Sequence, residues 1–486
     1  MLNLKPTTIN HQPTTNNQHM KQLLLFLGSL SFGLTTTAQC YQNLQFGGGH
    51  TIGESSNGTL WGWGYGGYGE LGTTNDTEPL PVQVSTATDW NRFYLGGKTT
   101  FAIKDNGTLW GCGSNYKGIL GLNTSTQTFS TFQPITAATN WLKISPTQYY
   151  TLALKTDGTL WGWGMNNYYQ LGFAPAIEQQ MTPVQIGTDT DWVDLSSGTS
   201  GTNFAIKADG TIWGWGSNLH NLLHFGSDVT YYTTPTLVNS QTDWVKISSG
   251  GTQILAQKSD GTLWSWGAGP AMGIGTSIPT TTTAQQISTD TWKYFTTGVN
   301  TSFGIKSDGT LWGWGRNYNG QVGDGTTIDR YYPVQLGSAT NWDTVQARDF
   351  QTFMATKTDG TVWYWGINYY GEFGNGMDYD ATYYLTPQLT PGVCAVPLTT
   401  QGFNKITALD LYPNPAKQTV TIAYDLNEQP TDLIVYDLFG RTVYQRNVHG
   451  LTGNREIPLE QLQEGIYLVT IQNKSKIIIQ EKLIKQ

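Results

Sequence analysis

The sequence predicts an all-β protein whose main domain is a seven-bladed β-propeller. The first observation is an octapeptide, Asp/Asn-Gly-Thr-(Leu/Ile/Val)-Trp-x-(Trp/Cys)-Gly, whose seven copies begin at Asn57, Asn106, Asp157, Asp209, Asp260, Asp308 and Asp359. The second is their spacing of 48 to 52 residues, which is typical of repeat architectures. The third is that no helical periodicity separates the copies. Seven four-stranded units of this length close into a ring.

The octapeptide predicts a β-hairpin. Asp/Asn-Gly is the strongest short signal for a hairpin turn, and a primed turn requires positive φ at both central residues. An alternating apolar segment precedes the turn, as in residues 101–104, and an extended Thr-Leu-Trp segment follows it. In Trp161-Gly162-Trp163 the strand period of two places both indoles on one face. Because all 19 Trp lie in the repeat region, we expect indoles to form the blade cores.

Two further landmarks complete each unit. A Trp opens a short apolar strand ahead of six of the octapeptides, at Trp90, Trp141, Trp192, Trp244, Trp292 and Trp342. A Pro-Val-Gln strand begins at Pro81, Pro183 and Pro333. Three or four strands per fifty residues fit a propeller blade. The first unit lacks the landmark Trp, so we expect a strand from the far end of the repeat region to complete that blade.

The repeats resemble those of the regulator of chromosome condensation family. The resemblance includes the loop after the Trp-rich strand, which is best kept at residues 315–323. Weaker copies of this loop occupy residues 64–72, 113–121, 164–172 and 366–374, and units four and five depart from it. The resemblance covers about residues 41–391 and implies the propeller fold. It does not imply the nucleotide exchange at chromatin that the family's founding member performs, because one fold serves unrelated functions.

Charge argues against a nucleic-acid partner. Residues 41–402 hold 15 Lys and Arg against 25 Asp and Glu, a net charge of −10. Proteins that bind nucleic acid present a basic surface. The composition therefore predicts that this ring binds no nucleic acid.

The N-terminus predicts export. Met20-Lys21, an apolar stretch at residues 23–34 and the small residues that end at Ala38 have the order of a signal peptide. We expect Met20 to be the true start and residues 1–38 to be removed. The apolar stretch is too short to span a bilayer, and no other segment approaches the length of a transmembrane helix.

The C-terminal stretch resembles the type A sorting domain of the type IX secretion system of Bacteroidota. The residues that carry the resemblance are Tyr412, Pro413, Asn414, Pro415, Gly440, Gly465, Tyr467, Lys482 and Lys485. The resemblance implies a small Ig-like β-sandwich that the secretion machinery recognises and usually removes. The cargo would pass through the periplasm and be released or anchored at the outer cell surface. The alternative is an ordinary C-terminal adhesion sandwich.

These signals divide the chain into four parts. We expect a signal peptide at 1–38, a propeller at 41–392, a linker at 393–405 and a sorting domain at 406–486. Cys40 and Cys394 flank the ring, whose ends meet when it closes, so we expect a disulfide between them. The alternative is two unpaired thiols. Cys112 replaces the second Trp of its octapeptide and is expected to be a buried thiol.

Tyrosines crowd the loops and are the predicted ligand-binding residues. They are Tyr65, Tyr68, Tyr116, Tyr168, Tyr169, Tyr318, Tyr369 and Tyr370. A second set follows at Tyr231, Tyr232, Tyr331, Tyr332, Tyr383 and Tyr384. Tyrosine offers stacking area and a hydroxyl at low entropic cost, which suits protein and glycan partners. The alternative is that these rings only pack the loops against one another.

A lysine stands three residues before the turn glycine in six units, at Lys104, Lys155, Lys207, Lys258, Lys306 and Lys357. The symmetry of the repeat places these cations at one height, where a circle of charge would hold an anionic glycan. The favoured interpretation is a solvated strand end that discourages edge pairing.

No catalytic constellation is visible, and we predict no cofactor and no metal site. His220 and His224 share a loop without further ligands, and Asp324-Gly325 lacks the acidic spacing of a calcium loop. The leading hypothesis is a secreted, surface-displayed propeller that binds a protein or glycan. The alternatives are a polysaccharide-degrading or peptide-modifying enzyme, whose paired acids would come from different blades, and a structural envelope protein.

Overall fold

The computed structural model describes most of the chain from Gln39 onward. The residues that it leaves undescribed are 1–38, 174–177, 219–221, 224–228, 276–279, 348–350, 378–379, 396–407, 413–415, 426–429, 438–440, 449–451, 474–475 and 486. The predicted signal peptide, the two histidines of one loop and most of the predicted linker lie outside the described residues.

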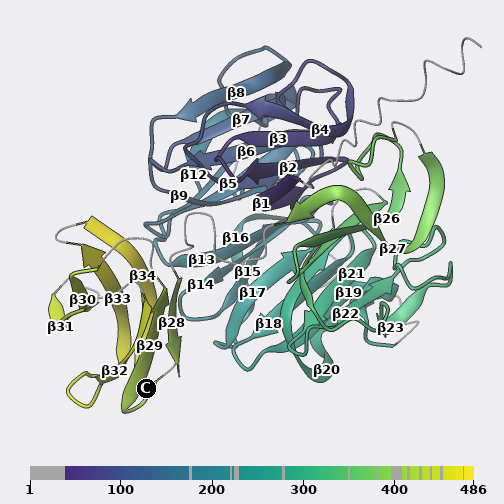
Figure 1. Cartoon of the computed structure of the whole chain (residues 1–486). Coiled ribbons are helices and arrows are strands. Elements are labelled where there is room, and N and C mark those ends of the chain that lie inside the picture. Colours follow the sequence, from purple (N-terminus) through teal and green to yellow (C-terminus); the bar gives the residue numbers. More distant parts are fainter. Residues whose placement is uncertain are drawn as a thin grey trace, which may run out of the picture. The chain divides into compact units, whose positions relative to one another are not determined.

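The described strands between Gln39 and Ala395 form seven four-stranded units, which we number as blades 1 to 7 (Figure 1). Blade 1 contains β1 (Gln39–Phe46), β2 (His50–Ser55), β3 (Leu60–Tyr65) and β4 (Thr77–Ser85). Blade 2 contains β5 (Trp90–Leu95), β6 (Thr99–Lys104), β7 (Leu109–Ser114) and β8 (Thr128–Thr136). Blade 3 contains β9 (Trp141–Pro146), β10 (Tyr150–Lys155), β11 (Leu160–Met165) and β12 (Gln179–Gln185).

Blade 4 contains β13 (Trp192–Ser197), β14 (Thr202–Lys207), β15 (Ile212–Ser217) and β16 (Tyr231–Asn239), and blade 5 contains β17 (Trp244–Ser249), β18 (Gln253–Lys258), β19 (Thr262–Ala268) and the first part of β20 (Thr280–Thr297). Blade 6 continues from β20 with β21 (Thr301–Lys306), β22 (Leu311–Gly315) and β23 (Arg330–Gln335). Blade 7 contains β24 (Trp342–Ala347), β25 (Thr352–Lys357), β26 (Thr361–Asn368) and β27 (Asp380–Ala395). The long β20 is the fourth strand of blade 5 and the first strand of blade 6. Two 3-10 turns, η1 (Tyr116–Gly118) and η2 (Pro270–Met272), lie in loops.

The first strands of the blades close the ring. Contacts run from β1 to β5, β9, β13, β17, β20 and β24 and back to β1. Each blade has its strands in sequence order, and its neighbouring strands are antiparallel. The fourth strands are the most exposed, whereas the second strands are buried along nearly their whole length. The predicted all-β, seven-bladed propeller is therefore confirmed.

Blade 1 is completed differently from the prediction. Its first strand is β1, which precedes β2 directly, and the far end of the repeat region adds only a short parallel pairing from β27. Tyr41 pairs with Ser55 as Trp90 pairs with Lys104, so a tyrosine occupies the place of the landmark Trp. Figure 1 shows the purple β1 beside the green end of β27.

The two chain ends of the ring are also joined covalently. Cys40 is directly opposite Cys394 in the parallel pair, and their sulfur atoms form a disulfide with a Cα–Cα distance of 4.4 Å. The bond closes a loop of 354 residues in sequence separation. On the chain-entropy model such a loop stabilises the fold by about 6 kcal/mol.

The hairpin turn of the octapeptide also corrects the prediction. Only the glycine has positive φ, for example 76° at Gly158, whereas the preceding Asp or Asn does not. The Asp side chain supports the turn instead: Asp157 Oδ1 accepts hydrogen bonds from the Thr159 amide at 3.0 Å and hydroxyl at 2.6 Å. Trp161 Nε1 then donates to Thr159 Oγ1 at 2.8 Å. Because all seven copies repeat this chain of bonds, the octapeptide is a side-chain motif as well as a turn signal.

The second Trp of the octapeptide joins neighbouring blades. Its Nε1 donates to a loop carbonyl of the preceding blade, in the pairs Trp163–Ile119, Trp215–Gln170, Trp266–Leu222, Trp314–Ala271 and Trp365–Gln321, at 2.7 to 3.0 Å. In blade 2 the buried, free Cys112 takes this place and its thiol lies 3.6 Å from the Glu70 carbonyl. These contacts fix each of blades 2 to 7 to the loop of the blade before it, whereas Trp63 Nε1 of blade 1 is buried without such a bond among the described residues.

The C-terminal part has its own core. One sheet contains β28 (Ala408–Tyr412), β29 (Thr419–Asp425) and β32 (Thr452–Pro458), and the other contains β30 (Asp432–Asp437), β31 (Thr442–Asn447), β33 (Gly465–Asn473) and β34 (Lys476–Lys485). Val420 and Ile422 of the first sheet share a hydrophobic cluster with Val435 and Val469 of the second. The two sheets therefore pack face to face. The assignment of this C-terminal domain to the Ig-like class stays a prediction.

We expect the Trp365→Phe substitution to lower the free energy of unfolding by about 2 kcal/mol, because the fully buried indole loses both its hydrogen bond and part of its volume. Trp363→Phe in the same strand is the matched control. Its half-buried Nε1 binds only Thr361, so about 1 kcal/mol or less should be lost. Urea unfolding followed by fluorescence measures both, and equal losses would contradict the role of the inter-blade bond.

Candidate binding face

Two sets of connections lie at one end of every blade. Because neighbouring strands are antiparallel, the turn between the first and second strands and the loop between the third and fourth strands share an end. The Asp/Asn-Gly turns lie at the opposite end. In blade 1 the amide of Tyr65, at the end of β3, donates to the carbonyl of Gly49, in the first turn, at 2.7 Å. We call this end the loop face, and all eight predicted ligand-binding tyrosines lie on it.

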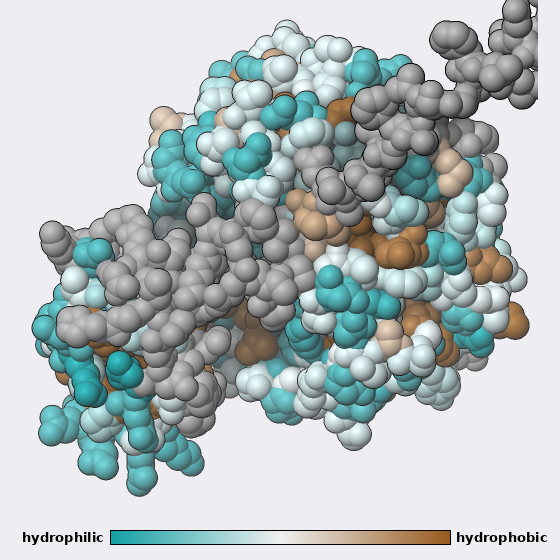
Figure 2. All heavy atoms as spheres, in the orientation of Figure 1, coloured by the Kyte–Doolittle hydropathy of each residue, from teal (hydrophilic) through white to brown (hydrophobic). Residues whose placement is uncertain are grey.

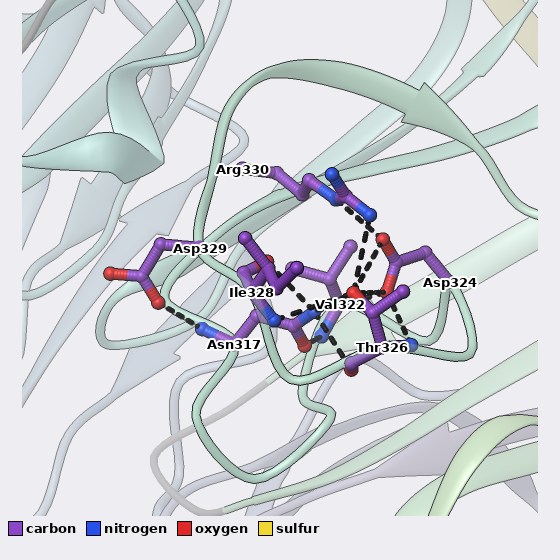
Figure 3. A network of polar contacts seen from close by, with 7 residues as sticks. All are labelled: Asn317, Val322, Asp324, Thr326, Ile328, Asp329 and Arg330. Carbon is purple, nitrogen blue, oxygen red and sulfur yellow. Dashed lines mark hydrogen bonds and ion pairs between the residues drawn. The ribbon is translucent and has the colours of Figure 1, made fainter.

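A buried asparagine shapes the loop between the third and fourth strands. It is present as Asn115, Asn166, Asn218, Asn317 and Asn368, and its Oδ1 accepts the amide of the residue five positions later. Figure 3 shows the best-developed example. Asn317 Nδ2 donates to the carbonyls of Thr326 and Ile328 at 3.0 and 3.1 Å, and its Oδ1 accepts from Val322 at 2.9 Å. The next residue, Tyr318, is therefore held on a rigid loop.

Asp324 binds other residues of the same loop. Its carboxylate accepts hydrogen bonds from Thr326 and Asn317 and forms an ion pair with Arg330 at 2.5 Å (Figure 3). Burial alone would raise the pKa of Asp324, but the hydrogen bonds from Thr326 and Arg330 outweigh burial and lower it. The carboxylate therefore stabilises the loop that carries Tyr318.

Six tyrosines of blades 6, 7 and 1 form a continuous group, which we call the tyrosine band. Its members are Tyr318, Tyr369, Tyr370, Tyr383, Tyr65 and Tyr68. The ring centroids of Tyr65 and Tyr370 are 4.6 Å apart across the seam between blades 7 and 1. Those of Tyr65 and Tyr68 are 5.9 Å apart, and those of Tyr369 and Tyr370 are 6.3 Å apart. The band thus crosses the place where the ring closes.

Tyr383 links the band to blade 6. Burial and a hydrogen bond with Tyr369 raise the pKa of the Tyr383 phenol, and the nearby Tyr318 adds to this effect. Tyr318 is 58% exposed and Tyr370 is 44% exposed, so the band presents ring surface to solvent. Part of each ring packs against its neighbours and part remains available for a ligand.

Polar groups border the band. Lys98, from the first turn of blade 2, donates to the Tyr68 hydroxyl at 3.1 Å and lies 4.2 Å from the centroid of its ring. Asn319 donates to Gln351 at 2.8 Å beside Tyr318. Sequence reasoning missed Lys98 because it belongs to a turn with no repeated signal, and it assigned Tyr383 to the secondary set.

The other predicted tyrosines lie outside the band. Tyr168 and Tyr169 form a second cluster with Tyr231, which stacks on Tyr168 at 5.6 Å. Tyr116 is half-exposed beside Lys117. In the secondary set, Tyr232, Tyr331 and Tyr332 range from half-buried to exposed, and Tyr384 donates to Asp380. The structure therefore brings together five of the eight predicted residues and adds Tyr383.

Two buried glutamates lie beneath the band. Glu70 of blade 1 accepts the amide of Tyr68 at 2.8 Å, and Glu372 of blade 7 accepts the amide of Tyr370 at 2.8 Å. Burial raises the pKa of both carboxyls to about 7. They are acids from different blades, as the enzyme alternative requires, but both are almost fully inaccessible to solvent. Their position favours a role in the loops.

The six repeated lysines are not freely solvated. Each ammonium lies between two indoles, the landmark Trp and the first Trp of the octapeptide, at 3.7 to 5.5 Å from the ring centroids. Lys104, Lys207, Lys258 and Lys306 also pair with Asp, and their side chains are only 10 to 15% exposed. The interpretation as solvated strand ends is therefore wrong, because the indole faces attract the cations.

Across the described parts of the chain, no three His, Cys, Asp or Glu residues group as metal ligands. Nor is any helix in those parts long and apolar enough to cross a membrane. Figure 2 shows one face of the molecule, where hydrophilic and intermediate residues predominate and hydrophobic patches are small and separate.

The sorting-motif residues are only partly described. Tyr412 ends β28, Gly465 begins β33, and Lys482 and Lys485 lie in β34. Tyr467 is buried, and its hydroxyl donates to the Gln463 carbonyl at 2.9 Å. Pro413, Asn414, Pro415 and Gly440 lie outside the described residues.

Family models match both parts of the chain. The model of the regulator of chromosome condensation repeat matches residues 57–103, 157–204 and 308–348, and a second model of this repeat matches 293–321. The model of the secretion system C-terminal sorting domain matches residues 410–486. This chain carries regulator of chromosome condensation repeats and a C-terminal sorting domain. The predicted resemblances are confirmed, and the sorting domain points to export through type IX secretion, to the cell surface or the medium.

Relatives of known name share the repeats. The regulator of chromosome condensation of Xenopus laevis is 27% identical over 26% of this chain and 31% of its own length. The E3 ubiquitin-protein ligase HERC2 of Homo sapiens is 29% identical over 49% of this chain and 5% of its own length. The ultraviolet-B receptor UVR8 of Arabidopsis thaliana is 24% identical over 48% of this chain and 42% of its own length. The chain thus spans less than half the length of these relatives.

Solved structures show the same fold. Prp20p from Saccharomyces cerevisiae has a TM-score of 0.61 at 20% identity, covering 73% of this chain and 87% of that chain. Human WBSCR16 has a TM-score of 0.57 at 18% identity, covering 63% and 85%. The TM-scores support the propeller architecture of the repeat region, and the low sequence identities leave its partner open.

We expect the joint replacement of Lys155, Lys306 and Lys357 by Met to destabilise the propeller by about 1 kcal/mol per site, because each indole pair loses its cation. The matching Arg variants should keep most of the stability. Retention on immobilised heparin, a sulfated polysaccharide, should be the same for the unaltered protein, the Met variant and the Arg variant. Loss of retention in the Met variant alone would support the anionic-glycan hypothesis instead.

Proposed function

We propose that this protein is an exported propeller that binds a protein or glycan partner through the tyrosine band. The observation that carries the proposal is the grouping of six tyrosines from three consecutive blades on the loop face, with Tyr318 and Tyr370 about half exposed. Tyrosine combines stacking area with a hydroxyl and loses little entropy when a ligand binds.

The rigidity of the band supports binding. Tyr318 follows the Asn317 network, and Tyr65 and Tyr370 pack on each other across the seam. A pre-ordered surface binds with less loss of conformational entropy than a mobile one. The net charge of −10 over residues 41–402 disfavours polyanionic partners. A partner with polar groups and ring or apolar surface fits this arrangement.

The export half of the proposal rests on the sorting domain at residues 410–486. In this proposal residues 1–38 are removed at the inner membrane, the propeller crosses the periplasm, and the secretion machinery recognises the C-terminal domain. The propeller is then anchored at the outer surface or released.

We expect the native protein to lack residues 1–38 and the region from about residue 405 onward. Intact mass and terminal peptides from cell-surface and medium fractions measure both ends. The fraction that holds the processed protein also indicates where its partner is met. Retention of the C-terminal domain in the mature protein would contradict the sorting role and favour an adhesion module.

We expect Tyr318→Ala and Tyr370→Ala together to abolish capture of the partner by the mature protein, because both remove exposed ring surface from the band. Tyr116→Ala is the control, since it removes a half-exposed tyrosine of the same face outside the band. A glycan array and a pull-down from the surface fraction provide the measurements. Capture that survives the double change but not the control change would refute the band as the binding site.

A further inference from the structure

The two glutamates beneath the tyrosine band replace an amide that other blades use. In blades 3 and 6 the same loop position holds Gln170 and Gln321, whose Oε1 atoms accept the amides of Tyr168 and Asn319 at 2.7 and 2.8 Å. Glu70 and Glu372 make the corresponding bond to the residue two positions earlier. The repeat therefore contains its own comparison between a neutral and an ionisable group in one loop geometry.

The replacement adds a group that is costly to ionise. Both carboxyls are buried, at 0% and 3% exposure. Only one oxygen of Glu70 is hydrogen-bonded, since Oε1 has no partner among the described residues. A carboxylate that is buried with backbone donors alone and no ion pair pays much of the penalty for leaving water.

The groups that face the glutamates do not neutralise them. Lys98 lowers the pKa of Glu70 and Asp76 raises it, and both effects are smaller than that of burial. For Glu372, two backbone hydrogen bonds lower the pKa of the carboxyl, but burial raises it by more. Tyr364 lies near Glu372, and Cys112 lies near Glu70. His50 is also near, because it bonds to Thr100, whose hydroxyl donates to the Glu70 carbonyl.

We propose that Glu70 and Glu372 are positioning residues that make the tyrosine band sensitive to pH. The loops that carry Tyr68 and Tyr370 are closed when the carboxyls are protonated and open more readily when the carboxyls ionise. The inference rests on the proposed function, since it concerns the regulation of the same binding surface. A ligand of the band is held more tightly in a mildly acidic medium than in a neutral or alkaline one.

The direction follows from proton linkage. In the closed loops burial raises the pKa of both carboxyls to about 7, above the ordinary value of 4.5. The closed form therefore binds more protons than the open form between these two values, and its stability falls as the pH rises through that window. Between pH 5 and pH 8 each loop opens more often by up to about a hundredfold, and above pH 8 little further change is expected.

Amide hydrogen exchange on the intact mature protein tests the inference without a ligand. Protection factors, which remove the intrinsic effect of pH on exchange, are measured for Tyr68 and Tyr370 at pH 5, 6, 7 and 8. The amides of Tyr168 and Asn319, bound by the glutamines, are internal controls. We expect protection at Tyr68 and Tyr370 to fall by tenfold or more and protection at the controls to stay constant.

Two variants separate the carboxyls from His50 and from general unfolding. The double variant Glu70→Gln and Glu372→Gln should lose the pH dependence and keep high protection at both pH limits. The reciprocal Gln321→Glu should create pH-dependent protection at Asn319. Equal change at the control amides, or pH dependence that survives the double variant, overturns the inference. Failure to find any ligand while the exchange result holds would refute the proposed function and leave the acid-stabilised loops standing.

Discussion

The hydrogen bond between a buried indole and a loop carbonyl of the preceding blade is the interaction on which the rest of this propeller depends. In five of the seven blades the second Trp of the octapeptide reaches out of its own blade and binds the loop that connects the third and fourth strands of its neighbour. Blade packing and loop position are therefore set by one contact. Because Trp365 binds the loop that carries Tyr318, the core of the ring also helps to position this member of the tyrosine band.

Charge is sparse in this protein and is used for structure. The six repeated lysines lie between indole faces, where the negative charge of the ring surface attracts the ammonium group and the stem covers apolar area. Asp324 is committed to the loop that holds Tyr318, and Glu70 and Glu372 support the loops of the seam. The candidate recognition groups of the tyrosine band are uncharged phenols, so the net charge of the ring disfavours polyanions but does not select among other partners.

The seam between blades 7 and 1 concentrates several separate features. The disulfide between Cys40 and Cys394, the parallel pairing of β1 with β27, the closest tyrosine pair and both buried glutamates belong to these two blades. The closure of the ring joins the two ends of the repeat region, and there the first unit has Tyr41 in place of the landmark Trp. The structural closure of the ring and the candidate binding surface therefore coincide.

The sequence by itself determined the number of blades, the hairpin at the centre of each unit and the sorting domain, because an octapeptide repeated seven times and a terminal motif depend only on local spacing. It also placed Cys112 in the core, since that residue stands in a Trp position. Only the tertiary structure decided which tyrosines meet, that Tyr41 replaces the missing Trp, and that the lysines face indoles. Those facts depend on side-chain contacts within and between strands, from Lys306 with Trp312, six positions apart, to Tyr65 with Tyr370, more than 300 positions apart, and no local pattern records which side chains a closed ring brings together.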